Sequence, residues 1–62
     1  MNLIQGKIAE IYLDGGVTKA KVCVGGAHIR VPLMLLMEAN VGDEILIESG
    51  MAISRVEAAQ NG

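Results

Sequence analysis

The fold of this chain is most restricted by residues 41–54, in which short apolar runs alternate with turn-forming residues. Val41-Gly42-Asp43 predicts a chain reversal, because glycine adopts backbone angles that other residues avoid and aspartate can accept a hydrogen bond within its own turn. The apolar run Glu44–Glu48 is too short for a helix, so it predicts a strand. Gly50 predicts a bend or bulge before a second strand over Met51–Val56. Such a bent pair is expected to close a small β-barrel.

The first part of the chain reads as a long strand followed by a turn. Leu3–Leu13 alternates in hydrophobicity, but the alternation changes phase at Ile8-Ala9. A phase change of this kind indicates a β-bulge or sharp coil, which small barrels use where one strand serves two sides. Asp14-Gly15-Gly16 predicts the turn that ends this strand.

Two further strands are expected next. Val17–Val24 and Ala27–Leu33 alternate, and Gly25-Gly26 between them predicts a two-residue hairpin loop. Pro32 cannot donate to a neighbouring strand, so it is expected at a strand end or at a sheet edge. The residues predicted to face inward are Ala20, Val22, Val24, Ala27, Ile29, Val31 and Leu33.

Residues 34–39 break the alternation and contain good helix formers, which predicts a short helical turn. The sequence therefore predicts an all-β fold: a small five-stranded OB-like barrel with this turn between the third and fourth strands. Residues 1–57 are expected to form that single domain. Residues 58–62 are expected to form a C-terminal tail that extends a turn of helix or frays.

The chain has more apolar residues than so small a core can bury. Of its 62 residues, 52% are hydrophobic and Tyr12 is the one aromatic residue. An exposed apolar surface is therefore expected, and on a soluble protein this usually marks a partner-binding site. The cluster Met34–Met37 is a candidate, because successive residues of a helical turn lie about 100° apart and cannot all point inward. Two interpretations stay open: that most of the cluster fills the barrel, or that part of it is a docking site.

Composition argues against several other classes of function. The net charge of −2 and the lack of aromatic stacking platforms disfavour nucleic-acid binding. No signal-peptide pattern is visible, and no apolar run is long enough to span a bilayer. The single cysteine excludes an intramolecular disulfide and fits a reducing compartment, so the cytoplasm is the expected location.

One pair of residues is a candidate for chemistry. A two-residue loop at Gly25-Gly26 would place Cys23 directly opposite His28, with Lys19, Lys21 and Arg30 nearby. This is a possible reactive pair, or half of a metal site. A structural zinc site needs four ligands, and nucleophilic catalysis needs an orienting third group, and neither is visible. We therefore favour two ordinary residues brought together by register, and we predict no metal site, no bound cofactor and no catalytic residue.

The overall pattern resembles the HypC/HupF family of hydrogenase maturation chaperones. The matching elements are Gly6-Lys7-Ile8, Val24-Gly25-Gly26, Val31-Pro32-Leu33 and the closing run from Val41 to Ser54. In the family that run reads Val-Gly-Asp-Tyr-Val-Leu-Val-His-x-Gly-Phe-Ala-Ile, and it is the most specific part of the likeness. The resemblance covers about residues 3 to 57.

The resemblance implies a non-catalytic chaperone with an OB-like barrel. Such a protein binds a maturation scaffold and the immature large subunit of a nickel–iron hydrogenase, and it takes part in transient handling of iron. The candidate partner-binding residues are Met1, Asn2, Leu3, Met34, Leu35, Leu36 and Met37.

The sequence departs from the family at the N-terminus. The family begins Met-Cys-Leu-x-Ile-Pro-Gly-Lys, whereas here Asn2 replaces the cysteine, Gln5 replaces the proline and the segment is one residue shorter. An amide cannot replace a thiolate as a soft iron ligand, so thiol-dependent iron handling is not expected to transfer. The histidine of the closing run is Glu48. We interpret the chain as a diverged member or a paralogue of the family that keeps protein–protein binding, either with the family's partners or with a different client.

Two alternatives of another class remain. Small barrels also serve as oligomeric oxyanion-binding modules of the molybdate type, for which Thr18, Lys19, Lys21 and Ser49 are candidates. A homo-oligomer would also account for the excess of apolar residues. An OB-like nucleic-acid binder is the third alternative, and the negative net charge and single aromatic residue of the chain disfavour it.

Overall fold

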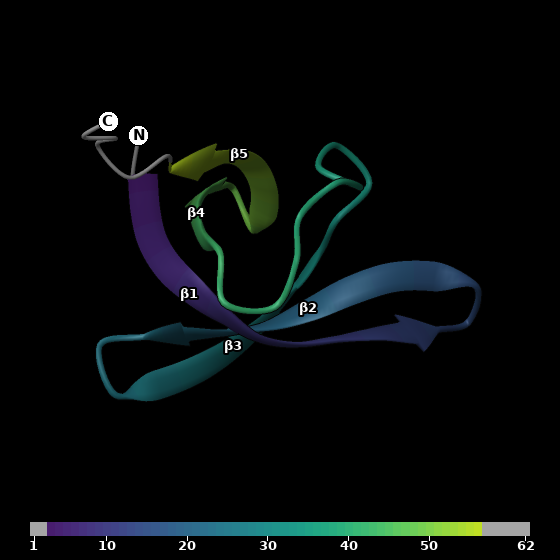
Figure 1. The fold of residues 1–62 in the computed structure, drawn as a ribbon, viewed down its shortest axis with the longest axis horizontal. Coiled ribbons are helices and arrows are strands. Elements are labelled where there is room, and N and C mark those ends of the chain that lie inside the picture. Colours follow the sequence, from purple (N-terminus) through teal and green to yellow (C-terminus); the bar gives the residue numbers. More distant parts are fainter. Residues whose placement is uncertain (1–2, 57–62) are drawn as a thin grey trace.

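The computed structural model of the protein describes residues 3–56. Five β-strands form one sheet (Figure 1). They are β1 (Leu3–Asp14), β2 (Val17–Val24), β3 (Ala27–Pro32), β4 (Glu44–Glu48) and β5 (Met51–Val56). Their order in the sheet is β3-β2-β1-β4-β5, and every pairing is antiparallel. The predicted all-β class and its five strands are confirmed.

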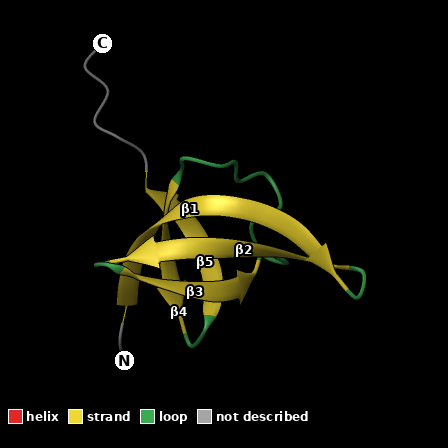
Figure 2. Ribbon diagram, turned by 90° about the horizontal axis from the view of Figure 1, so that it is seen from below, coloured by secondary structure: helices red, strands yellow, loops and turns green. Residues whose placement is uncertain are grey.

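The predicted closed barrel is wrong, because the sheet is open and has β3 and β5 as its edges. β1 curves so that it pairs with β4 through its first half and with β2 through the remainder (Figure 2). The edge strands approach each other without pairing. Pro32 ends β3 without an N–H, and an extra residue, Ile53, interrupts the pairing of β5. Closing the barrel would require a continuous ladder of hydrogen bonds between β3 and β5. The missing N–H of Pro32 and the bulge at Ile53 both interrupt such a ladder.

The predicted bulge in β1 is confirmed. Ile8 pairs with Val22 and Glu10 pairs with Lys21, which leaves Ala9 as the extra residue. Side chains alternate between the two faces of a strand, so an inserted residue shifts the phase of the alternation. As a result Ile8 is buried and Ile11 also packs against the core.

The expected helical turn is also wrong: residues 3–56 contain no helix, and residues 33–43, here called the turn segment, form consecutive β-turns. The N–H of Leu36 donates to the carbonyl of Leu33 at 2.9 Å, and the N–H of Ala39 donates to the carbonyl of Leu36 at 3.2 Å. Each of these bonds closes a four-residue β-turn, so the residues that close the turns are three positions apart. Leu33, Leu36 and Ala39 therefore return to the same side of the chain, and all three are buried.

The chain reversal expected at Val41-Gly42-Asp43 is confirmed as the last of these turns. The N–H of Asp43 donates to the carbonyl of Asn40 at 3.0 Å, and the Asp43 carboxylate accepts a hydrogen bond from the N–H of Asn40 at 2.9 Å. Gly42 has a φ of 97°, which L-residues with a side chain rarely adopt. The hairpin loop at Gly25-Gly26 is also confirmed, since Val24 pairs with Ala27.

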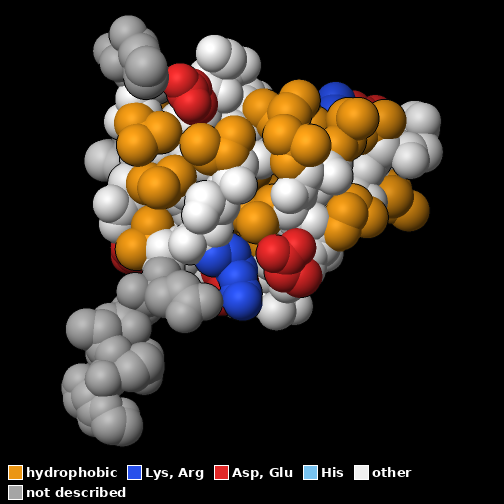
Figure 3. All heavy atoms as spheres, turned by 90° about the horizontal axis from the view of Figure 1, so that it is seen from above, with side chains coloured by type: hydrophobic (Ala, Val, Ile, Leu, Met, Phe, Trp, Pro, Cys, Tyr) orange, Lys and Arg blue, Asp and Glu red, His pale blue; other side chains and the backbone are white. Residues whose placement is uncertain are grey.

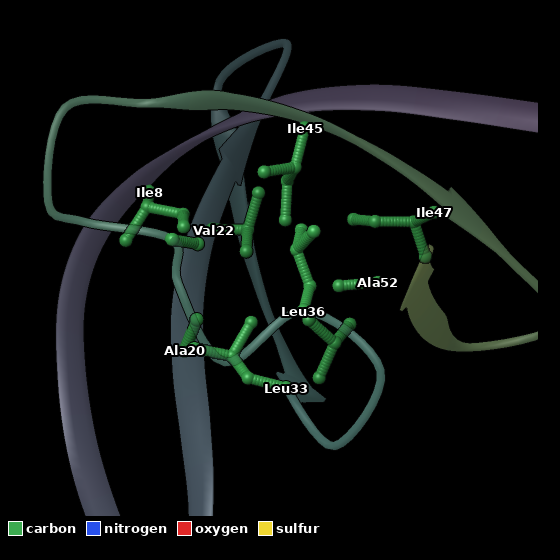
Figure 4. Close-up of a cluster of buried hydrophobic side chains, with 10 residues drawn as sticks. Ile8, Ala20, Val22, Leu33, Leu36, Ile45, Ile47 and Ala52 are labelled. Atoms are coloured by element: carbon green, nitrogen blue, oxygen red, sulfur yellow. The ribbon is translucent and has the colours of Figure 1, made fainter. Parts of the chain in front are cut away.

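The core lies between the inner face of the sheet and the turn segment. Leu33 and Leu36 point into the same cluster as Ile45, Ile47 and Ala52 (Figure 4). The buried hydrophobic residues are Ile8, Ala20, Val22, Val31, Leu33, Leu36, Ala39, Ile45, Ile47 and Ala52. Ala27, which the alternation predicts to face inward, is exposed because it adjoins the hairpin loop.

Candidate partner-binding surface

The turn segment carries a group of exposed apolar side chains. Met34, Leu35, Met37 and Val41, here called the apolar turn cluster, are 62%, 64%, 64% and 61% exposed. They occupy the central positions of the β-turns and therefore point away from the buried residues that close each turn. Because Leu33, Leu36 and Ala39 are packed in the core, the backbone of the turn segment is fixed and keeps the exposed side chains on the surface.

Exposed apolar side chains also occur beyond the turn segment. Orange side chains spread across the face seen in Figure 3, with few charged groups between them. The other large exposed hydrophobic residues are Leu3, Ile4, Leu13 and Ile53. The exposed apolar surface expected from composition is therefore present. Exposed apolar side chains that gather on one face are typical of a binding site.

The Asp43 carboxylate anchors the end of the turn segment to the sheet. One of its oxygens accepts the hydrogen bond from Asn40 and lies 3.7 Å from an Arg55 guanidinium nitrogen on β5. The backbone adds two bonds of 2.9 Å, from Gly42 N–H to the Ile8 carbonyl and from Ile8 N–H to the Asp43 carbonyl. These contacts fix where the apolar turn cluster lies relative to β1.

The structure separates the sequence candidates for partner binding. Met34, Leu35 and Met37 are on the surface, whereas Leu36 is 4% exposed and belongs to the core. Leu3 is exposed at the start of β1, opposite Glu48 of β4. Met1 and Asn2 lie outside the described residues. Val41 was not among the candidates, although its position within the predicted Val41-Gly42-Asp43 reversal indicated that it is exposed.

Cys23 and His28 lie directly opposite each other on β2 and β3, as the hairpin register predicts. Cys23 is half-buried and His28 is exposed. Lys7 of β1 lies opposite Cys23 on its other side, which the sequence did not indicate because the bulge at Ala9 sets that register. Within residues 3–56, no three His, Cys, Asp or Glu side chains are grouped closely enough to hold a metal ion.

Replacement of Cys23 by serine is expected to change the free energy of unfolding by about 1 kcal/mol or less and to leave partner binding intact. This expectation follows from the prediction that Cys23 and His28 are ordinary residues brought together by the hairpin register. Urea denaturation and a binding assay test this, with Val22→Ala at the adjacent, fully buried position as the variant that should lose more stability. Loss of binding by folded Cys23→Ser would show that the thiol takes part in function.

The residues proposed for an oxyanion site do not come together within one chain. The Nζ of Lys19 is 2.9 Å from the Asp14 carboxylate, and this hydrogen bond and the negative charge raise the pKa of Lys19 above its ordinary value. Thr18 lies opposite Leu13 near one end of β1, whereas Ser49 follows Glu48, which lies opposite Leu3 at the other end. The length of β1 thus separates the two groups.

Comparison with known protein families tests the resemblance to the HypC/HupF family. The sequence model of the HupF/HypC family matches residues 4–61, almost the whole chain. The protein belongs to the HupF/HypC family. Members of this family are chaperones that work with protein partners in hydrogenase maturation. No curated protein and no solved structure matches the chain significantly. In the described part of the chain, no helix has the length and apolar character needed to cross a membrane.

Proposed function

We propose that this HupF/HypC protein is a non-catalytic chaperone of the cytoplasm. It binds a hydrogenase maturation scaffold, an immature hydrogenase large subunit, or both, through the apolar turn cluster. The observation that carries the proposal is the outward display of Met34, Leu35, Met37 and Val41. The segment that carries them buries every third residue from Leu33 to Ala39 in the core.

The physical properties of the cluster fit protein binding. Transfer of apolar side chains out of water favours association, at roughly 25 cal/mol per Å² of surface buried. Methionine is unbranched and flexible, so Met34 and Met37 can adapt to an irregular partner surface. The fixed backbone of the turn segment limits the conformational entropy that binding would cost.

Iron handling through an N-terminal thiol is not part of the proposed function. Asn2 occupies the position at which the family resemblance implies a cysteine, and an amide is a poor ligand for a soft metal site. Cys23 is a poor substitute, because it lies in the middle of the sheet between Lys7 and His28.

The double variant Leu35→Glu/Met37→Glu is expected to lower affinity for purified hydrogenase large-subunit precursor or maturation scaffold at least about tenfold. Charges placed in an apolar contact lose hydration without gaining a partner, and 1.4 kcal/mol corresponds to a factor of ten. Calorimetric titration measures the affinity, and circular dichroism checks the fold. Leu13→Glu is the matched control, since Leu13 is 72% exposed and lies outside the turn segment.

Unchanged affinity in the double variant, with wild-type binding demonstrated, would rule out the apolar turn cluster as the binding site. Sedimentation of the free proteins should accompany the titration. If wild type self-associates and only the double variant is monomeric, the cluster is a contact between copies of this chain.

A further inference from the structure

Positively charged residues gather on one face of the sheet. Ala20 and Val22 of β2 are buried, so the alternating residues of that strand face outward. Figure 2 views the molecule from the side on which β1, β2 and β3 lie. Directly opposite residues share a face, which gives three adjacent rows across β1, β2 and β3: Lys7-Cys23-His28, Glu10-Lys21-Arg30 and Tyr12-Lys19-Pro32. Four of the five Lys and Arg residues therefore lie on this outer face.

The middle row contains an unfavourable pair. Lys21 and Arg30 lie directly opposite each other on neighbouring strands, and like charges in this arrangement destabilise a sheet. The ion pairs among residues 3–56 are Lys19–Asp14 and Arg55–Asp43. Neither pair involves Lys21 or Arg30. Glu10 of β1 lies opposite Lys21 and offsets part of its charge, whereas Arg30 on the edge strand β3 has Lys21 as its one directly opposite neighbour. Lys7 and Arg30 are exposed, so both charges are accessible to a partner.

The charge of this face contrasts with the rest of the chain. Residues 1–32 contain four Lys or Arg and two acidic residues, whereas residues 33–62 contain one Arg and five acidic residues. A chain of net charge −2 thus has a basic outer face. Such a face favours encounter with a partner of opposite charge.

We propose that the outer face of β1, β2 and β3, centred on Lys7, Lys21 and Arg30, binds an acidic polypeptide segment of a partner protein. Carboxylates of that segment would pair with Lys7 and Arg30, the exposed cations of this face, which form no ion pair within residues 3–56. Glu10 interrupts the basic residues of the middle row, and Tyr12 is the one aromatic residue available for base stacking. A nucleic acid carries a charge on every phosphate, whereas a polypeptide can place a neutral residue against Glu10 and carboxylates against the basic residues. These two features favour a polypeptide over nucleic acid.

This basic face is separate from the apolar turn cluster. The turn segment contributes Leu33 and Leu36 to the core on the inner side of the sheet, where Ala20 and Val22 also point (Figure 4). Lys21 and Arg30 face the other way. The small domain therefore presents two binding surfaces of different chemistry, one apolar and one basic.

The test uses a fluorescein-labelled oligoglutamate peptide, with oligolysine and single-stranded DNA as comparison ligands, in fluorescence anisotropy at low ionic strength. Wild type is expected to bind oligoglutamate in preference to both, and added salt is expected to weaken the binding. Arg30→Gln should lower the affinity about threefold and Lys21→Gln/Arg30→Gln about tenfold. The matched control is Arg55→Gln, which removes the same charge from the other edge strand, β5, and should leave the affinity unchanged.

The melting temperature separates binding from folding. Arg30→Gln should melt at the wild-type temperature or above it, because it relieves the repulsion with Lys21. The proposal is overturned if oligoglutamate does not bind, if Arg55→Gln weakens binding as much as Arg30→Gln, or if DNA binds more tightly than the peptide through Arg30. It is equally overturned if the chain sediments as a dimer that Arg30→Gln dissociates, since the occupant would then be a second copy.

Discussion

The Gly6→Ala variant is expected to lose about 3 kcal/mol or more of its free energy of unfolding. Gly6 is buried in β1 beside Lys7, which pairs with both β2 and β4, and a Cβ atom at Gly6 would clash with Cγ1 of Val22. It would also lie 2.8 Å from Cγ2 of Val24 and 3.0 Å from the carbonyl oxygen of Cys23. A domain of this size has roughly 3 to 9 kcal/mol of stability in total, so much of the variant should be unfolded.

Chemical denaturation followed by circular dichroism measures this effect, and a second substitution identifies its cause. Removing the nearest obstacle in Gly6→Ala/Val22→Ala should cost less than the sum of the two single substitutions, because the clash is shared. Lys7→Ala, at the exposed next position of the same strand, is the control and should change stability by about 0.5 kcal/mol or less. Full stability of Gly6→Ala would mean that β1 and β2 are further apart than the structure places them.

The Ile45→Ala variant is expected to lose about 2 to 5 kcal/mol of stability. Ile45 is fully buried on β4, directly opposite Gly6 of β1. It lies in the cluster that joins the turn segment to the sheet (Figure 4). The cost combines lost transfer free energy with a cavity that a rigid sheet cannot close. No disulfide compensates, because the chain has one cysteine.

Ile53→Ala provides the matched comparison, since Ile53 is the extra residue of β5 and is 37% exposed. It should lose clearly less stability than Ile45→Ala in the same urea titration. Equal losses at the two positions would contradict the core described above. A preserved midpoint in Ile45→Ala would do so as well.

Local features of the sequence predicted the strands correctly. Alternation over Val17–Val24 and the loop at Gly25-Gly26 depend on neighbouring residues only, and both are confirmed. The two-residue loop also determined which residues of the hairpin oppose each other, so the Cys23–His28 pairing followed from it. The phase change at Ile8-Ala9 located the bulge for the same reason.

The errors arose where distant segments decide the outcome. Helix propensity favoured a helical turn over residues 34–39, but burial of Leu33, Leu36 and Ala39 at a spacing of three residues is satisfied by successive β-turns. Propensity is a weak preference that tertiary packing overrides in a segment this short. A barrel closes only if the two edge strands, β3 and β5, form hydrogen bonds with each other. The alternation within each strand does not specify whether they do.

The sequence by itself determined the all-β class, the reversals and the bulge in β1, because glycine turns and period-two patterns act over a few residues. It also determined the membership of the HupF/HypC family, which the family model detects from the sequence. The tertiary structure alone decided that the sheet stays open and that Leu36 turns inward while Met34, Leu35 and Met37 turn outward. It also decided the alignment of Lys7 with Cys23 across the bulge. These features depend on contacts between segments far apart in the chain, and such contacts form only when the whole sheet packs.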